Sequence, residues 1–249
     1  MSLPSLRRAS SSDAGHPHPL GVGGSDGNAG VLPGQELRKP PSPSPLTPSF
    51  CRAYNGGMKG IRITGGRLKG RRVAGGRDRG TRHTSAKVRE AVFDVAGDVE
   101  GAFVLDLFAG TGSFAIEALS RAAASVTAVE RDRRTASLLR GNLRDLALDK
   151  DCLVLDMEVR YAVPMLYGQG RRFDLIFVDP PYEMGYVAPT LELLEKHPLY
   201  RDGSMIVFEH SKREGLGASP GRGREVESRR YGDTVLTVIR TAGRRAHPA

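Results

Sequence analysis

The sequence predicts an α/β protein built on a doubly wound, mostly parallel sheet of seven strands that ends in an antiparallel hairpin. Two observations carry this prediction. Along residues 103–208, short apolar segments alternate with segments of helical period, as in parallel βαβ units. Two strand-like segments, 225–231 and 234–240, then follow, joined by Gly232-Asp233, a pair that favours a tight hairpin turn.

The two ends of the chain carry no such pattern. Residues 1–57 are rich in Pro, Ser and Gly and show no hydrophobic period, so they cannot bury enough apolar area to offset their chain entropy. We expect them to be disordered, and the same holds for a tail at 243–249. The N-terminal stretch is either a transit peptide, which implies an organelle, or an over-long start before Met58. We favour the second alternative and a cytoplasmic protein.

The net charge of +9 is concentrated in one short segment. Residues 58–90 hold eleven Lys and Arg against two acidic residues, whereas residues 1–57 hold five against three and residues 91–249 hold 21 against 23. Such a local excess is typical of a protein that binds a polyanion, although a solvated basic face is the alternative. We expect residues 58–97 to form a small basic RNA-binding element and residues 98–242 to form the catalytic domain.

The basic element is expected to begin with a short strand at 61–64, where side chains alternate. Glycine pairs at 65–66 and 75–76 bracket a basic run. A helix then runs to about residue 95, capped by Thr84 or Ser85, because apolar residues recur at helical spacing. Six basic side chains are expected to contact RNA phosphates: Arg62, Arg67, Lys69, Arg71, Arg72 and Arg82.

The catalytic region should then alternate strand and helix. Five strands are expected before the hairpin, at 103–107, 126–129, 152–155, 173–178 and 205–208. Four helices are expected between them, at 113–121, 132–146, 159–166 and 187–196. Pro164 should shorten the third of these helices.

A glycine turn follows the first of these strands. Gly110 and Gly112 lack a Cβ, so they permit a tight turn and a close backbone approach to a ligand, and the next helix presents its free N–H groups there. Phe108 lies in the same turn, and we include it among the cofactor-binding residues. No third glycine follows in register, so an adenosyl cofactor is expected in preference to NAD.

Three acidic residues end the first three strands. Glu130 ends the second strand about twenty residues beyond the glycines, where an acid binds a ribose diol. Asp156 ends the third strand and is placed to accept from an adenine amino group. Asp106 ends the first strand and could orient the turn or contact the ammonium group of the cofactor. Solvated strand-end carboxylates are the alternative reading of Glu130 and Asp156.

The segment Asp179-Pro-Pro-Tyr182 follows the fourth strand and favours chemistry at an exocyclic base amine. Such an amine is a poor nucleophile because its lone pair is delocalised into the ring. Two acceptors on its hydrogens, the Asp179 carboxylate and the Pro180 carbonyl, would orient the lone pair toward an electrophilic methyl group. The ring of Tyr182 would stack on the extruded base. Transfer then depends on proximity and orientation, and no metal is required.

The two cysteines, Cys51 and Cys152, are too few and too far apart for a disulfide framework or a zinc site, which favours a reducing compartment. Neither lies near Asp179. Methylation at a pyrimidine carbon, which usually needs a cysteine nucleophile, is therefore excluded. No apolar run approaches the roughly 18 residues of a membrane helix, so we expect no membrane partner.

Four segments together resemble the bacterial 16S rRNA (guanine-966-N2)-methyltransferase family: 61–72, 81–93, 105–112 and 179–182. The resemblance extends over about residues 58–242 and includes Tyr231-Gly-Asp-Thr234. It implies a Rossmann-like class I methyltransferase fold, S-adenosylmethionine as donor, and a guanine N2 in small-subunit rRNA as acceptor. It also implies assembled or nearly assembled 30S particles as the substrate. His83 replaces a proline usual in the family, and residues 1–57 match nothing in it.

Alternative functions remain at this point. DNA adenine-N6 methyltransferases and enzymes acting on other RNAs share the Asp-Pro-Pro-Tyr chemistry, because the tetrapeptide does not identify the base. The basic element and its resemblance to the rRNA methyltransferase family together favour rRNA over DNA. A non-catalytic RNA-binding assembly factor is the other alternative, against which the intact Asp179, Glu130 and glycine turn argue, and a dehydrogenase is a distant third. We expect a monomeric enzyme.

Overall fold

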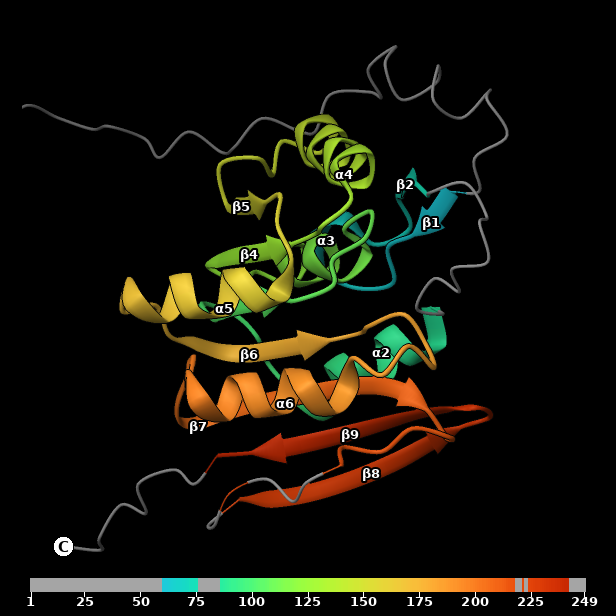
Figure 1. Cartoon of the computed structure of the whole chain (residues 1–249). Coiled ribbons are helices and arrows are strands. Elements are labelled where there is room, and N and C mark those ends of the chain that lie inside the picture. Colours follow the sequence, from blue (N-terminus) through green and yellow to red (C-terminus); the bar gives the residue numbers. More distant parts are fainter. Residues whose placement is uncertain (1–59, 76–85, 218–220, 222–223, 242–249) are drawn as a thin grey trace, which may run out of the picture. The chain divides into compact units, whose positions relative to one another are not determined.

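The computed structural model describes residues 60–75, 86–217, 221 and 224–241. The predictions for residues 1–57 and 243–249, and those for Arg82 and the helix cap at 84–85, lie outside these residues. The described residues contain a seven-stranded mixed sheet and a separate two-stranded sheet (Figure 1). The predicted fold class is confirmed, because the large sheet has the order β5-β4-β3-β6-β7-β9-β8 and is mostly parallel.

Neighbouring strands on one side of the large sheet run parallel: β5 (Cys152–Leu155), β4 (Ser125–Val129), β3 (Phe103–Asp106), β6 (Phe173–Val178) and β7 (Tyr200–Ser211). β9 (Thr234–Arg240) pairs antiparallel with both β7 and β8 (Glu225–Tyr231). The carboxyl ends of the parallel strands therefore lie along one edge of the sheet, where ligands bind in open α/β sheets.

Helices cover both faces of the sheet (Figure 1). One face carries α2 (Ala86–Ala96), α3 (Ser113–Ser120) and α4 (Arg133–Asp145). The other face carries α5 (Val159–Gly168) and α6 (Val187–Lys196). The rings of Phe93, Phe114 and Phe177 stack in series on the first face, with centroid separations of 4.9 and 4.0 Å. Each face thus has its own buried apolar cluster.

Two sequence expectations need correction. Pro164 does not shorten its helix, because α5 continues to Gly168. Pro164 has no N–H, so the Arg160 carbonyl lacks its usual hydrogen bond within the helix. Because Arg160 is exposed, water can donate to that carbonyl instead. β7 is also longer than the expected 205–208, since it extends from Tyr200 to Ser211.

The basic element folds as β1 (Gly60–Arg62), the short 3₁₀ helix η1 (Gly66–Leu68) and β2 (Arg72–Ala74), and the two strands pair antiparallel. Gly66 has a φ of 69°, and a Cβ there would clash with the backbone carbonyl of Ser120 in α3. The Ser120 hydroxyl accepts from the Leu68 N–H (2.9 Å) and donates to the Gly65 carbonyl (2.6 Å). The element is therefore packed closely against α3.

A buried carboxylate strengthens this attachment. Glu117 of α3 is fully buried, and its oxygens accept from the backbone N–H and the hydroxyl of Thr64, each at 2.8 Å. Arg121 pairs with the same carboxylate at 3.1 Å, and the buried Arg89 of α2 lies 3.5 Å from it. Burial lowers the pKa of Arg89, and Glu117 opposes that shift. No helix in the described part of the chain is long and apolar enough to cross a membrane.

Candidate functional site

The glycine loop, residues 107–112, turns from the end of β3 to the start of α3. The Leu107 N–H donates to the Phe177 carbonyl of β6 (3.0 Å), and the Ala109 N–H donates to the Val129 carbonyl of β4 (2.9 Å). The loop is therefore fixed between the two strands that flank β3.

Its two predicted glycines have different surroundings. Gly110 has a φ of 54°, and a Cβ there would meet no described atom within 4 Å, so that side of the loop is open. Gly112 has a φ of 89°, and a Cβ there would clash with Leu139 of α4. Gly110 leaves space for a ligand, whereas Gly112 is required by the packing of the loop on α4.

Glu130 lies against the glycine loop. One carboxylate oxygen accepts from the Gly110 N–H (2.9 Å) and the other accepts from the Asp132 N–H (2.7 Å). Each carboxylate oxygen has a second lone pair, so both can still accept a hydroxyl of a diol. The structure thus brings Glu130 and Gly110 together, as the prediction of a ribose site requires.

Asp106 is a buried carboxylate at the same edge. Its residue is 1% exposed, and neither oxygen makes a hydrogen bond with the described residues. Burial raises its pKa to about 7, while the backbone N–H dipoles of Phe108 and Ala115 oppose the shift and the Glu130 charge adds to it. The carboxylate is thus approached by two backbone N–H groups but by no cation among the described residues, and a positively charged ligand group would favour its ionised form.

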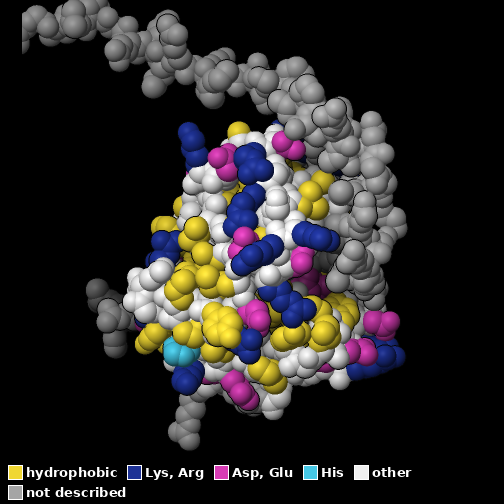
Figure 2. Space-filling view, turned by 45° about the horizontal axis from the view of Figure 1, so that its top comes forward, with side chains coloured by type: hydrophobic (Ala, Val, Ile, Leu, Met, Phe, Trp, Pro, Cys, Tyr) yellow, Lys and Arg dark blue, Asp and Glu magenta, His cyan; other side chains and the backbone are white. Residues whose placement is uncertain are grey.

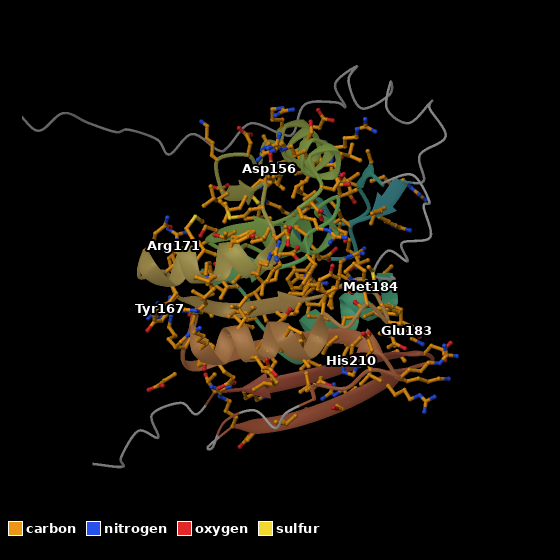
Figure 3. The ribbon with its side chains drawn as sticks, viewed as in Figure 1. Asp156, Tyr167, Arg171, Glu183, Met184 and His210 are labelled. Carbon is orange, nitrogen blue, oxygen red and sulfur yellow. The ribbon has the colours of Figure 1, made fainter. Side chains whose placement is uncertain are left out.

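Asp156 lies further from the loop, beyond the end of β5 and exposed (Figure 3). Arg140 of α4 contacts both of its oxygens at 3.1 Å and also donates to the Val154 carbonyl. The sequence reasoning missed Arg140, and the role of Asp156 toward an adenine stays a prediction.

The β6–α6 loop, residues 179–186, begins next to the glycine loop. The register pairs Asp106 of β3 with Phe177 of β6, so Asp179 follows the strand adjacent to the glycine loop. Asp179 is partly buried and Pro180 is buried. Tyr182 directs its hydroxyl to the Glu209 carboxylate of β7 and the Thr234 hydroxyl of β9, both at 2.9 Å. The Tyr182 hydroxyl therefore makes its hydrogen bonds within the protein, so a ligand would contact Tyr182 through the ring.

Two further residues at this edge were missed from the sequence. The ring of Tyr186 contacts that of Phe108 in the glycine loop, with centroids 6.0 Å apart. Arg131, which follows Glu130, donates to the Tyr186 hydroxyl at 2.9 Å and lies 5.7 Å from its ring. These contacts join the loops after β3, β4 and β6. An aromatic residue shortly after Asp-Pro-Pro-Tyr was the only signal in the sequence.

The predicted RNA-binding side chains lie on the β1–η1–β2 element. Arg62, Arg67, Lys69 and Arg72 are exposed and Arg71 is partly exposed. α4 adds basic residues that the charge count of residues 91–249 had concealed, namely the exposed Arg133, Arg134 and Arg144. Figure 2 shows Lys and Arg side chains across the upper part of the visible face, interspersed with Asp and Glu.

Asn142 of α4 connects the basic element to the glycine loop. Its side-chain oxygen accepts from the Ala74 N–H, and its NH₂ group donates to the carbonyls of Ala74 and Thr111, all at 3.0 Å. Since Ala74 ends β2 and Thr111 belongs to the glycine loop, one amide holds both segments. Asn142 is 3% exposed, and nothing in its local sequence indicated this contact.

Comparison with known proteins gives a family and several relatives. A family model described as "Conserved hypothetical protein 95" matches residues 61–240. Ribosomal RNA small subunit methyltransferase D of Escherichia coli (strain K12) is 35% identical over 138 residues, which are 55% of this chain and 68% of that protein. The tRNA (guanine(10)-N2)-dimethyltransferase of Methanocaldococcus jannaschii is 32% identical over 134 residues, 51% of this chain and 37% of that protein. The solved structure of a hypothetical protein from Thermus thermophilus superimposes with a TM-score of 0.61 and 29% identity, covering 72% of this chain and 98% of that one.

Proposed function

Because the chain belongs to the family described as Conserved hypothetical protein 95, we propose that it methylates the exocyclic N2 of a guanine in 16S rRNA, with S-adenosylmethionine as the donor. The names of the Escherichia coli and Methanocaldococcus jannaschii relatives support an rRNA substrate and a guanine N2 acceptor, respectively. The resemblance found in the sequence, to an rRNA methyltransferase family, agrees with both. Assembled or nearly assembled 30S particles are the proposed substrate.

One observation carries the proposal. The glycine loop and Asp179-Pro180 follow two adjacent parallel strands, β3 and β6, and the Leu107–Phe177 hydrogen bond joins them at 3.0 Å. A donor held at the first loop and a base amine held at the second would therefore be neighbours. Such proximity is the main source of rate in a transfer that uses no covalent enzyme intermediate.

The residues around the glycine loop suit S-adenosylmethionine, which supplies a methyl group on a positively charged sulfur when bound. The buried Asp106 carboxylate, whose pKa burial raises, would be complemented by the positive charge of that molecule. Glu130 retains acceptor capacity for a ribose diol, and the open side of Gly110 leaves room for the ligand. We assign Phe108 to the same pocket and Asp156 to its adenine end, whereas Gly112, predicted from the sequence to bind the cofactor, would shape the pocket through its packing on Leu139.

Asp179 and Pro180 would act on the base. The carboxylate and the carbonyl accept the two amine hydrogens, which makes the nitrogen pyramidal and orients its lone pair. As the N–C bond forms and the C–S bond breaks, the nitrogen must lose one proton, and the Asp179 carboxylate is the acceptor in place. Tyr182 stacks on the base, worth roughly 1–3 kcal/mol, which offsets part of the cost of extrusion.

The basic element would hold the RNA. Exposed Arg62, Arg67, Lys69 and Arg72 are proposed to contact phosphates, with Arg71 and Arg82. Such contacts set the register of the substrate and do not choose the base. The attachment of this element to the glycine loop through Asn142 would keep the bound strand in a fixed relation to the site.

The test is transfer of labelled methyl groups from S-adenosylmethionine to three substrates: 30S subunits lacking the modification, naked 16S rRNA, and duplex DNA. The proposal predicts incorporation into 30S subunits and little or none into DNA. Incorporation of labelled methyl groups into DNA alone would show that the substrate is DNA and not rRNA. Cofactor binding without incorporation into any substrate would favour the non-catalytic assembly factor.

A further inference from the structure

The β6–α6 loop is held in place by the C-terminal part of the sheet. The Tyr182 hydroxyl contacts Glu209 and Thr234, each at 2.9 Å. Glu183 accepts from the Ser211 hydroxyl at 3.2 Å (Figure 3 labels Glu183). The register pairs Ser211 with Thr234 across β7 and β9. Side chains two residues apart share a face, so Glu209, Ser211 and Thr234 all project from one face of the sheet toward this loop.

The direction of the hydrogen bonds follows from the groups present. Tyr182 has one hydroxyl hydrogen, and the Glu209 carboxylate accepts it. Thr234 must then donate to the tyrosine oxygen. Glu209 and Thr234 are 3% and 4% exposed, so water does not compete readily for these bonds. Burial raises the pKa of Tyr182, which keeps its hydroxyl protonated at neutral pH.

The backbone of the same loop is also constrained. Glu183 has a φ of 57°, a conformation that costs about 1 kcal/mol for a residue with a side chain. Its carboxylate is held by Ser211 and by Arg213, both at 3.2 Å, and the Gly185 N–H donates to Glu214 at 3.3 Å. Several bonds thus over-determine the path of the loop, as expected where the local conformation is unfavourable.

We propose that Glu209 and Thr234 are positioning residues that fix the ring of Tyr182 in the plane required to stack on the target guanine. This inference rests on the proposed function. The two hydrogen bonds hold the hydroxyl oxygen and so fix the tilt of the ring. Because a phenol O–H lies in the plane of its ring by conjugation, the same bonds oppose rotation of the ring about its Cβ–Oη axis, so stacking on the base requires little further ordering of the side chain. The inference also gives a role to Thr234, the last residue of the Tyr231–Thr234 segment that belongs to the family resemblance in the sequence.

A double-mutant cycle on turnover tests the inference. Tyr182→Phe keeps the ring and deletes the hydroxyl, and Thr234→Val deletes the partner hydroxyl at nearly constant volume. Tyr182→Phe removes both bonds of the hydroxyl and is expected to lower kcat about threefold, whereas Thr234→Val removes one of them and is expected to lower kcat about twofold. The double variant should match Tyr182→Phe alone at about threefold, because the bond that Thr234→Val deletes is already absent without the phenol hydroxyl. The Kd for S-adenosylmethionine should stay at the wild-type value in all three variants.

Two further variants separate positioning from general stability. Thr234→Ser retains a hydroxyl and should restore wild-type kcat, and Glu209→Gln retains an acceptor oxygen and should remain within about threefold of it. Thermal unfolding of each variant identifies any loss that comes from a poorly folded protein. Independent effects, giving about a sixfold loss in the double variant, would overturn the inference, as would wild-type kcat in Tyr182→Phe.

A readout without methyl transfer keeps this inference separate from the proposed function. The flip rate of the Tyr182 ring can be followed by NMR of ring-labelled tyrosine, with Tyr182→Phe assigning the signal among the seven tyrosines. The rate should rise in Thr234→Val. An unchanged rate in an enzyme that methylates 30S subunits would overturn the inference alone. If the ring-flip rate rises in Thr234→Val but the wild-type protein methylates none of the substrates, the positioning of Tyr182 by Thr234 would stand and the proposed function would be wrong.

Discussion

The glycine loop and the β6–α6 loop lie side by side but are held in different ways. Backbone bonds to the two adjacent strands hold the glycine loop, namely Leu107 to Phe177 and Ala109 to Val129. The β6–α6 loop is held by side chains that come 27 and 52 residues later in the chain, from Glu209 and Thr234. The proposed cofactor side is thus held to the neighbouring strands largely through its backbone, whereas the proposed base side is held by side chains from β7 and β9.

This difference has a functional consequence. The glycine loop can remain the same while acceptor substrates change, because the bonds described for it come from β4, β6, Glu130 and α4 and not from the C-terminal hairpin. A loop fixed by β7 and β9 can be altered by changes in the C-terminal hairpin alone. We therefore expect cofactor affinity and base handling to respond to separate sets of substitutions.

The largest difference between the effect on kcat and the effect on cofactor affinity is expected for substitution of Asp179. Replacement by Ala removes the proposed acceptor of the amine hydrogens and should lower kcat at least about a hundredfold, as for loss of a transition-state acceptor. The Kd for S-adenosylmethionine should remain within about twofold of wild type, because the carboxylate is proposed to act on the base. Single-turnover methylation and calorimetric cofactor binding measure the two quantities. A parallel loss of cofactor affinity would show that the two loops are not separable.

The next largest difference is expected between Gly110 and Gly112, whose substitution should affect cofactor affinity and fold stability, respectively. Gly112→Ala should destabilise the fold by about 2–4 kcal/mol, because the new methyl group clashes with Leu139 at a positive φ. Gly110→Ala should cost only about 1 kcal/mol of stability yet weaken cofactor binding, since its methyl group enters the open side of the loop. Thermal unfolding and cofactor titration of both variants make the comparison. Equal loss of stability in both would contradict the assigned roles.

Asp106 should make cofactor binding depend on pH. Its pKa is raised from 3.8 to about 7, so its contribution to folding stability is full below pH 3.8 and is lost as the pH rises through 7. A positively charged ligand favours the ionised form, so the affinity should rise about tenfold per pH unit below 7 and level off above it. Asp106→Asn should flatten this profile. Calorimetry from about pH 5.5 to about pH 8.5 spans this transition, and a flat profile in wild type would remove Asp106 from the cofactor site.

The smallest effects are expected in the basic element. Arg67→Ala and Lys69→Ala should each reduce the slope of log affinity against log salt by about 0.7 and leave kcat unchanged. Arg171→Ala is a matched control, because Arg171 is exposed but precedes β6 and so lies at the opposite edge of the sheet (Figure 3). Filter binding of the RNA at several salt concentrations measures the slope. An equal change in the control would indicate only a general effect of net charge.

Much of the architecture was predictable because it follows local periodicity. The bounds of β6, α6, β8 and β9 match the sequence prediction, since each element has a clear period and marked ends. Parallel topology alone placed Asp179 and the glycine loop at the same edge of the sheet, and the observed pairing of β3 with β6 makes them neighbours. Pro164 misled the prediction because a proline disrupts a helix only where the lost hydrogen bond cannot be replaced by water.

Four residues make contacts that the sequence did not indicate. Asn142, Glu209, Thr234 and Arg131 act through partners between 27 and 68 residues away. A single sequence gives no periodic signal for such pairs, because their spacing depends on how the sheet brings strands together. The basic residues of α4 escaped notice for a simpler reason, since the acidic residues of the same region cancel them in a charge count.

The central claim is that this site places a methyl group on the N2 of a guanine. The most direct measurement is mass spectrometry of nucleosides from 16S rRNA, after 30S subunits lacking the modification are incubated with the protein and S-adenosylmethionine. The account predicts a single N2-methylguanosine from the wild type and none from Asp179→Ala. N6-methyladenosine, a carbon-methylated pyrimidine, or equal product from the Asp179→Ala variant would contradict it.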